Sequence, residues 1–433
     1  MTRLPELYHA YLQCSDVSID SRKLSGNSLF IALKGSQRDG NQYVKQALQD
    51  GARYALADDP ALSDCDRVFV VPDSLAALQE LARYHRRQLK LPVIGLTGSN
   101  GKTTSKELFR SVLATKYNTF ATPGNYNNHI GVPLSILSIH PEHEMAVIEM
   151  GANHQREIEF LCTISMPDYV YITNYGLAHL EGFGGVEGIV KGKSEMYEYA
   201  RRYDKTALVN ADDPKQVENS AGIGKIITFG TSDHVDFNIR LFLTKPYVAV
   251  AFSNQIIHSR LTGIYNFSNI AAAVAIGAHF CIDTEMIKQG IQAYTPENNR
   301  SQLVETERAR FICDAYNANP SSMEGAVYNL ADFDGIRVAI LGDMYELGDY
   351  TDEAHQYISD LCEKVKIDEV YLIGEYFSRV KNTKWKKFKD ISAALEFFKT
   401  YDTSDKNILI KASRSMELER LYPILGILPA SNL

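Results

Sequence analysis

The chain has 433 residues, of which 45% are hydrophobic and 23% are charged, and its formal net charge at pH 7 is -8. This composition excludes a disordered or fibrous protein, and the acidic balance argues against a nucleic-acid partner. The six cysteines are scattered without C-x-x-C spacing, which disfavours a zinc site and a disulfide framework. At about 100–200 residues per domain, the length predicts two to four domains.

The first 88 residues predict a small α/β domain. Residues 28–33 and 67–71 are apolar runs of strand length, and residues 41–51 have a helical pattern. A boundary is expected near Lys90–Pro92, so we assign residues 1–88 to this domain. The N-terminus has no apolar core of signal-peptide length. The mildly apolar run Ile270–Ile282 is too short to span a bilayer and is interpreted as a buried helix. We therefore expect a cytoplasmic protein without a membrane span.

A glycine-rich loop follows the next strand candidate, Val93–Thr97, and leads into a helical pattern over residues 104–115. Loop amides, a helix N-terminus and a lysine together hold phosphate oxygens, and a hydroxyl after that lysine can bind Mg²⁺. Leu96 stands where the ordinary phosphate-loop pattern has glycine, so the loop predicts a nucleotide site of another kind. Its residues are Thr97, Gly98, Ser99, Asn100, Gly101, Lys102, Thr103 and Thr104.

Strands and helices alternate after the loop, which predicts a doubly wound, mostly parallel sheet in a central domain over residues 89–302. The strand candidates are Met145–Glu149, Tyr169–Thr173 and Ala207–Asn210, with helical patterns at residues 155–163 and 186–199. In such sheets ligands bind beyond the carboxyl ends of the strands, and the polar motifs of this chain fall at such ends.

Several of these polar residues are candidates for binding or catalysis. Glu149 ends a strand, and its carboxylate suits Mg²⁺ beside a phosphate loop, although a salt-bridged residue at the core edge is the alternative. His179 follows another strand end, and the residues alone leave open whether it binds a metal, because imidazole is not a usual ligand of Mg²⁺. Asn125, Asn127 and Asn128 form either a loop of Asx turns or a set of amide groups for a polar ligand.

Lys193 lies in the charged helical stretch Lys191–Glu195, and such a run is typical of a solvated face. The residues alone assign it no chemical role.

A third α/β domain is expected over residues 303–433. Its strand candidates are Ala309–Cys313, Val338–Leu341, Glu369–Ile373 and Asn407–Ile410. Arg300 precedes it and is placed to reach the γ-phosphate of ATP bound between domains. Asp314, just past a strand, is placed to accept hydrogen bonds from ribose hydroxyls. For each of these polar residues at element ends, Asn266, Arg300, Asp314 and Asn317, a purely structural role is the alternative.

Taken together, the motifs resemble the Mur ligases, the family that builds the peptide of bacterial peptidoglycan. Residues 98–104 resemble the ATP loop of this family. Residues 314–320 and 341–348 are the most specific and resemble the member that adds D-alanyl-D-alanine. The other stretches that carry the resemblance are residues 20–22, 29–35, 39–40, 149–152, 178–181, 208–213 and 411–414.

The resemblance implies roles for individual residues. The implied catalytic residues are Lys102, Glu149, His179 and Lys193. Lys102 would bind ATP phosphates, and Glu149 would hold one Mg²⁺ together with Thr103. His179 would help to hold a second Mg²⁺, and Lys193 matches a carbamoylated lysine of the family. Further ATP contacts are expected from Asn266, Arg300, Asp314 and Asn317. Contacts to the UDP-linked substrate are expected from Ser21, Arg22, Lys34, Asn125, Asn127 and Asn128. Contacts to D-alanyl-D-alanine, or within the C-terminal domain, are expected from Asn319, Lys411, Ser413 and Arg414.

The resemblance also implies an activity: ATP-driven amide formation between UDP-N-acetylmuramoyl-tripeptide and D-alanyl-D-alanine. Residues 1–88 would bind the UDP-sugar, the central domain would bind ATP, and a Rossmann-like C-terminal domain would close over it. No surface stripe indicates assembly, so we expect a monomer.

Three alternatives remain at this level: a sister ligase that adds a single amino acid, a nucleotide-dependent switch, and an inactive binding protein. Two departures from the family pattern make local contacts uncertain, because Ala412 replaces a glycine and Asn41 stands where many members have histidine.

Overall fold

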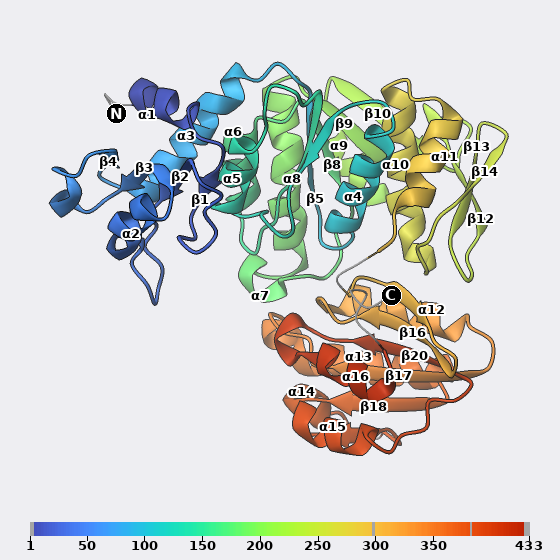
Figure 1. Ribbon diagram of the computed structural model, residues 1–433. Coiled ribbons are helices and arrows are strands. Elements are labelled where there is room, and N and C mark those ends of the chain that lie inside the picture. The colour runs from blue at the N-terminus through green and yellow to red at the C-terminus, as the bar shows by residue number, and fades with distance from the viewer. Residues whose placement is uncertain (1–3, 297–298, 382, 428–433) are drawn as a thin grey trace. The chain divides into compact units, whose positions relative to one another are not determined.

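The computed structural model describes residues 4–296, 299–381 and 383–427, and their strands form four β-sheets with helices packed beside them (Figure 1). The chain divides into two compact units. One contains the described residues up to Leu96 together with residues 117–152 and 156–170. The other contains residues 97–116, 153–155 and the described residues from Tyr171 onward.

The N-terminal sheet is parallel and has the order β1-β2-β3-β4. Its strands are β1 (Val17–Ser18), β2 (Ser28–Ile31), β3 (Ala52–Ala57) and β4 (Val68–Val70), and its helices are α1 (Leu4–Tyr11), α2 (Val44–Gln49) and α3 (Ser74–Gln88). The helix expected at residues 41–51 begins as a 3-10 turn, Gly40–Tyr43, because the Asp39 side chain accepts from Asn41 N–H and caps it there.

The second sheet has seven strands in the order β11-β10-β9-β8-β5-β7-β6. Their bounds are β5 (Val93–Thr97), β6 (Thr119–Ala121), β7 (Met145–Glu149), β8 (Tyr169–Ile172), β9 (Thr206–Asn210), β10 (Lys225–Gly230) and β11 (Phe237–Asn238). The β5–β7 and β9–β10 pairings are parallel, as the alternating pattern predicts. Every residue of β5 and β7 is buried, which is typical of a parallel sheet covered on both faces.

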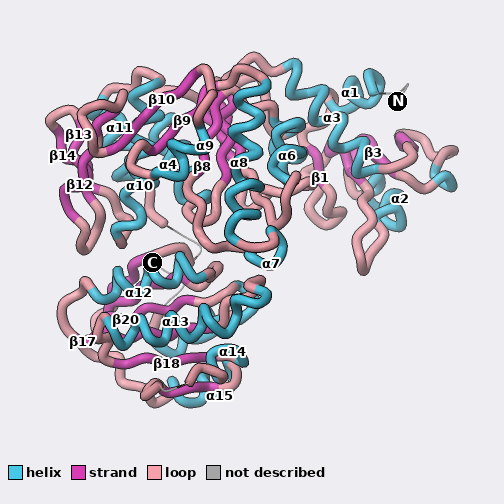
Figure 2. The backbone as a smooth tube through the Cα atoms, turned by 180° about the vertical axis from the view of Figure 1, so that it is seen from behind, coloured by secondary structure: helices cyan, strands magenta, loops and turns pink. Residues whose placement is uncertain are grey.

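Helices α4 (Lys102–Leu113), α8 (Val186–Arg202) and α9 (Pro214–Ser220) lie beside this sheet in both views (Figure 2). The other helices of this part of the chain are α5 (Gly131–Leu137), α6 (Glu157–Ser165) and α7 (Leu180–Phe183), and, later in the chain than β11, α10 (Phe267–His279) and α11 (Thr284–Ala293). Residues 269–277 of α10 are all buried, and α10 packs against α4, so the helix expected at 270–282 is confirmed as far as His279, where α10 ends, and Cys281 beyond it is exposed. Among the described residues, no helix is long and apolar enough to cross a membrane.

A small antiparallel sheet, β12-β13-β14, departs from the parallel pattern. It contains β12 (Arg240–Leu243), β13 (Ala249–Phe252) and β14 (Gln255–His258), and the sequence analysis does not identify it. β12 is largely exposed although Leu241–Leu243 are apolar, so its apolar run does not mark a buried strand.

The C-terminal sheet has the order β15-β16-β20-β17-β18-β19, and only β15 pairs antiparallel. The strands are β15 (Gln302–Glu305), β16 (Ala309–Asp314), β17 (Ile336–Gly342), β18 (Glu369–Ile373), β19 (Lys386–Phe388) and β20 (Lys406–Lys411). The helices are α12 (Pro320–Ala331), α13 (Thr351–Lys364), α14 (Glu375–Ser378), α15 (Ile391–Phe398) and α16 (Tyr422–Leu425). Asp314 and Leu341 both lie opposite Lys411, so three strands present their carboxyl ends at one edge.

Candidate active site

The glycine-rich loop joins β5 to α4 and approaches the segment after β8 very closely. A Cβ at Gly98 would lie 1.9 Å from Thr173 Oγ1, and the φ of Gly98 is 141°. Gly101 precedes α4 with φ 78°, and a Cβ there would lie 2.5 Å from Asn269 Oδ1. Both positions therefore require glycine for close approach and for backbone conformation.

Residues 173–176 hold this loop in place. Ser99 N–H donates to Asn174 O (3.0 Å), and Asn100 N–H donates to Asn174 Oδ1 (3.1 Å). The Thr173 hydroxyl donates to Asn100 O (2.6 Å), and the Ser99 hydroxyl donates to Gly176 O (2.6 Å). The sequence analysis misses these partners, whose only signal is their position after a strand end.

Lys102 and Thr103 begin α4, so their N–H groups lie in the first turn, where helix N–H groups have no intrahelical acceptor. Lys102 Nζ donates to the loop carbonyls of Gly98 (2.8 Å) and Ser99 (3.1 Å). The ammonium group therefore lies against the loop that the sequence predicts to hold phosphates.

Glu149 ends β7 with 1% of its surface exposed and lies opposite Leu96 of β5. Asn127 Nδ2 donates to Glu149 Oε1 (2.8 Å), and Gly151 N–H donates to Asn127 O (2.7 Å). Asn127 thus orients the carboxylate, a role that the sequence analysis does not assign to it.

The other two asparagines of this cluster behave differently. Asn128 Oδ1 accepts from Ile130 N–H (3.0 Å) and Gly131 N–H (2.9 Å) at the start of α5, which is the Asx-turn alternative. Asn125 is exposed.

His179 precedes α7, has φ 56° and keeps 19% of its side chain exposed. Its Nδ1 is hydrogen-bonded to the Glu346 carboxylate, and this hydrogen bond is the main cause that lowers the pKa of Glu346. Glu346 lies in the loop after β17. The sequence analysis notes the surrounding motif but does not single out this residue.

Lys193 corrects the interpretation of its segment as a solvated face. It lies in α8 with 0% exposure, and its Nζ lies 4.8 Å from the centroid of the Phe183 ring. Lys191, two residues earlier, is exposed. A 3.6-residue period separates these two lysines onto different faces, so only Lys191 fits the charge-run pattern. Lys193 lies within a helix, so not every motif lies at a strand end.

Asn266 is buried, and its amide groups bond within the protein. Its Nδ2 donates to Thr262 O (2.8 Å), and its Oδ1 accepts from Asn269 Nδ2 (2.9 Å). Asn269 Oδ1 in turn accepts from the Ser105 hydroxyl (3.0 Å), which links α10 to α4. The predicted contact of Asn266 with adenine stays a prediction.

Charged residues gather at the carboxyl edge of the C-terminal sheet. Lys411 Nζ, which is 3% exposed, pairs with Asp314 Oδ2 (2.6 Å) and donates to Asn317 O (3.1 Å). Arg300 lies with its Cζ 3.6 Å from the centroid of the Tyr316 ring. The buried ammonium group of Lys411 therefore neutralises the Asp314 carboxylate, and the Arg300 guanidinium lies in the segment of the chain that precedes these strands.

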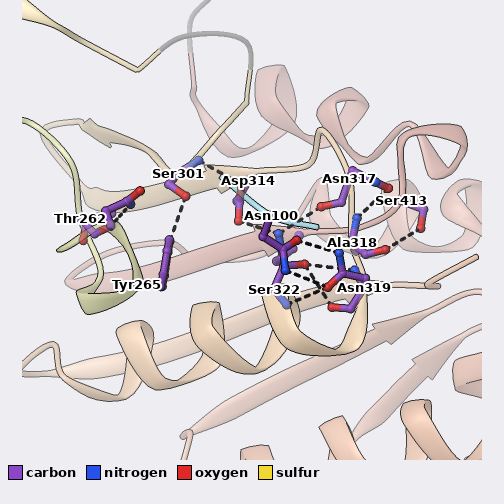
Figure 3. A network of polar contacts seen from close by, with 12 residues as sticks. Asn100, Thr262, Tyr265, Ser301, Asp314, Asn317, Ala318, Asn319, Ser322 and Ser413 are labelled. Carbon is purple, nitrogen blue, oxygen red and sulfur yellow. Dashed lines mark hydrogen bonds and ion pairs between the residues drawn. The ribbon is translucent and has the colours of Figure 1, made fainter. Parts of the chain in front are cut away.

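Asn319 connects this edge to the glycine-rich loop (Figure 3). Its Oδ1 caps α12 by accepting from Ser322 N–H (3.0 Å), and its Nδ2 donates to Asn100 Oδ1 (2.7 Å). The Ser413 hydroxyl accepts from Tyr345 N–H (3.1 Å). Arg414 is exposed.

The predicted substrate residues of the N-terminal domain lie at its surface. Arg22 hydrogen bonds lower the pKa of Asp20 to about 2, and Ser21 lies between these two residues. Lys34 Nζ pairs with Asp58 Oδ1 (3.0 Å). Asn41 donates from Nδ2 to Asp58 Oδ1 (2.7 Å), so asparagine at this position organises the acidic partner of Lys34.

The oxygen donors fit Mg²⁺ better than a transition metal. The Glu149 carboxylate and the Thr103 hydroxyl are hard ligands. Over the described residues, no group of three or more His, Cys, Asp or Glu side chains forms a metal cage. A cage of this kind is not needed by Mg²⁺, which commonly binds one or two carboxylates together with substrate phosphates.

Three family models match the chain in consecutive segments. Residues 14–86 match the Mur ligase family catalytic domain, residues 96–277 match the Mur ligase middle domain, and residues 299–414 match the Mur ligase glutamate ligase domain. The chain is also 34% identical to UDP-N-acetylmuramoyl-tripeptide–D-alanyl-D-alanine ligase of Bacillus subtilis, over 96% of this chain and 94% of that protein.

The chain belongs to the Mur ligase family.

Solved structures of Mur ligases have the same fold and the same three-domain layout. The crystal structure of MurF from Acinetobacter baumannii matches with a TM-score of 0.86 and 32% identity, and 98% of each chain is covered. MurF from Thermotoga maritima in complex with ADP matches with a TM-score of 0.83 and 27% identity, over 96% of this chain and 97% of that one.

Within this Mur ligase, the structure explains the remaining departure from the family pattern. A Cβ at Gly342 would lie 2.7 Å from the Ala412 methyl group, so the glycine on β17 leaves the space that the extra methyl occupies. Ala412 is fully buried there.

Proposed function

We propose that this chain joins D-alanyl-D-alanine to the C-terminal carboxylate of UDP-N-acetylmuramoyl-tripeptide and converts ATP to ADP and phosphate. The observation that supports this most strongly is the near-full-length similarity to ligases that bear this name. The ADP bound to the Thermotoga maritima relative supports nucleotide use by this chain. Residues 1–88 bind the UDP-linked substrate, residues 89–302 bind ATP, and residues 303–433 bind D-alanyl-D-alanine.

The reaction proceeds through an acyl phosphate. The tripeptide carboxylate attacks the γ-phosphorus of ATP, and the bond to the β-phosphate oxygen breaks, which releases ADP. The amine of D-alanyl-D-alanine then attacks the activated carbonyl, phosphate leaves, and the nitrogen loses a proton. Two anions must meet in the first step, so Lys102 and Arg300 offset their repulsion and stabilise the charge of the transition state.

Mg²⁺, when bound, neutralises phosphate charge. The resemblance to the family implies that Thr103 and Glu149 would each be a ligand of this ion, and Asn127 keeps the Glu149 carboxylate in position. His179 would help to hold a second ion. Lys193 is carbamoylated, since conversion to a carbamate turns a buried cation into an anion suited to a cation-rich site. The protein acts in the cytoplasm, the compartment that supplies ATP, and it acts as a monomer.

A phosphate-release assay over a panel of substrates tests this function. The panel pairs UDP-tripeptides ending in lysine or diaminopimelate with D-alanyl-D-alanine, glutamate or free diaminopimelate. Turnover that requires D-alanyl-D-alanine is expected. Turnover with a single amino acid would instead indicate a sister ligase, and ATP hydrolysis that ignores the peptides would indicate a nucleotide switch.

The Lys102→Ala variant supplies the inactive reference. Loss of one charge-stabilising group costs about 10²–10³ in kcat. Lys215→Ala, at an exposed lysine of α9, is the matched control and keeps full activity. Equal activity in the two variants would remove Lys102 from the mechanism.

A further inference from the structure

The loop after β17 is fixed by three successive N–H groups. Asp343 N–H donates to Ile373 O (3.1 Å), Met344 N–H donates to His355 Nε2 (3.0 Å), and Tyr345 N–H donates to Ser413 Oγ (3.1 Å). Asp343 and His355 are almost fully buried, at 1% and 0% exposure. The base of this loop is therefore rigid, because each group in it has a buried partner.

Glu346 projects from this rigid base toward the segment that carries His179. The Glu346 carbonyl accepts from Glu181 N–H (3.2 Å), while its carboxylate bonds to His179 Nδ1. Gly348, two residues further, also packs against this segment, since a Cβ there would lie in van der Waals contact, 3.4 Å from the Glu181 Cβ. Two polar contacts and one van der Waals contact thus join the same two segments.

Both residues of the pair have unusual backbone conformations. His179 has φ 56° and Glu346 has φ 62°, in the left-handed region that non-glycine residues seldom adopt. Such conformations are unfavourable for residues with a side chain and persist where the surroundings enforce them. Here the two conformations bring the imidazole and the carboxylate together.

We infer that Glu346 is a positioning residue that fixes the tautomer and the ring orientation of His179. A carboxylate only accepts hydrogen bonds, so the proton of neutral His179 stays on Nδ1 and the lone pair stays on Nε2. Carboxylate partners of this kind orient histidines that bind ions or substrates. The assignment rests on the proposed role of His179. It means that Glu346, a residue of the C-terminal domain, orients the His179 side chain of the central domain.

Imidazole ¹⁵N chemical shifts of the full-length protein test the tautomer directly and do not depend on activity. His179→Gln identifies the signal among those of the 11 histidines. In the wild type, the His179 shifts are expected to show a protonated Nδ1. Glu346→Ala is expected to shift His179 toward the Nε2-protonated form. Glu346→Gln keeps an accepting oxygen and is expected to retain the wild-type tautomer. Glu353→Ala, at an exposed glutamate of α13, is the control without effect.

Kinetics on the same variants separate positioning from damage to the fold. Loss of a carboxylate that orients a histidine typically lowers activity 10–100-fold, so Glu346→Ala is expected to lower kcat by that factor. Its ATP affinity is expected to stay within twofold of wild type, and Glu346→Gln is expected to recover kcat. Unchanged His179 shifts in Glu346→Ala would overturn the assignment, even if activity falls. A wild-type protein without ligase activity but with the expected shifts would overturn the proposed function and leave the positioning role standing.

Discussion

Lys102 and Lys193 belong to the same compact unit but have opposite surroundings. Lys102 is half-buried at the start of α4 and donates to two loop carbonyls that would lie beside phosphates. Lys193 is fully buried in α8 beside the face of Phe183. The proposed carbamate would replace the buried ammonium group of Lys193 by an anionic group.

Replacement of Lys193 by alanine is predicted to remove most activity, by about 10²–10³, because the variant loses the anionic group that the carbamate supplies. Short carboxylates added to the assay should partly restore turnover, since they can occupy the cavity left by the side chain. Lys191→Ala, on the exposed face of the same helix, is the matched control and should behave as wild type. Full activity of Lys193→Ala would refute the carbamate assignment, as would mass spectrometry that finds no added CO₂ under conditions that preserve carbamates.

At the scale of elements, the turn from β5 to α4 depends on the absence of a side chain at Gly98. Gly98→Ala is predicted to weaken ATP binding by at least tenfold, because the new methyl group would lie within 1.9 Å of Thr173 Oγ1 and the backbone has φ 141°. Isothermal titration with ATP measures this loss. Gly124→Ala also introduces a methyl group at positive φ, 53°, but with no atom within 4 Å, and its ATP affinity should stay unchanged. If both variants bind ATP equally well, the close approach of Gly98 to Thr173 is not the reason that the loop requires glycine.

Helices α1 and α3 meet around His85, a buried side chain of the N-terminal unit. Its Nε2 lies 2.9 Å from Ile139 O, and its Nδ1 lies 3.2 Å from the Tyr8 hydroxyl. Since a carbonyl only accepts, Nε2 carries the proton and Nδ1 accepts from Tyr8. Burial lowers the pKa of His85 below its ordinary value of 6.5.

This lowered pKa predicts that α1 and α3 become less stable in acid. Below about pH 6.5 the unfolded chain binds the His85 proton before the folded one does, so stability falls as pH falls toward the folded pKa. The slope is at most about 1.4 kcal/mol per pH unit for one group. Hydrogen exchange of α1 and α3 peptides at pH 7.5 and 5.5, corrected for intrinsic rates, should show the loss, and His85→Gln should flatten it. Peptides of α9 serve as the internal reference, and an equal pH effect there would rule out His85 as the cause.

The sequence predicts the elements well where burial is continuous. The bounds of β5, β7 and β18 agree with the predicted ones because buried parallel strands are unbroken apolar runs. β12 is missed because its antiparallel pairing with β13 is a tertiary contact that no local pattern marks; its apolar residues Leu241–Leu243 end up mostly exposed.

The site shows the same division between local and distant information. The loop at 97–104 is recognisable because all of its chemistry is contiguous. Asn174 and Glu346 are not recognisable, because each acts on a partner 74 or 167 residues away, and the residue type alone gives no signal. Lys193 is misread from its charged neighbours because helix geometry, rather than sequence adjacency, decides which lysine is buried.

At the scale of the whole molecule, the glycine-rich loop and the C-terminal domain share the amide pair Asn100–Asn319. The same Asn319 side chain caps α12, so one residue serves the helix and the contact. The acyl phosphate must be shielded from water, and we expect the C-terminal domain to close as a rigid body when ATP and the UDP-linked substrate bind. The Asn100–Asn319 contact requires the folded conformation of the glycine-rich loop, so it couples the position of this domain to the structure of the phosphate site.

Asn319→Ser is designed to remove the amide pair while keeping the cap, since serine caps helices about as well as asparagine. The variant is predicted to bind ATP with unchanged affinity but to lose roughly two- to tenfold in kcat, because one hydrogen bond contributes about 0.5–1.5 kcal/mol. Solution scattering should show a smaller radius of gyration for the wild type with ATP analogue and UDP-substrate, and a smaller change for Asn319→Ser. Asn219→Ser, at a half-buried asparagine of α9, is the control. Identical scattering of the wild type with and without ligands would contradict closure itself, whereas equal closure in wild type and variant would show that the amide pair takes no part in it.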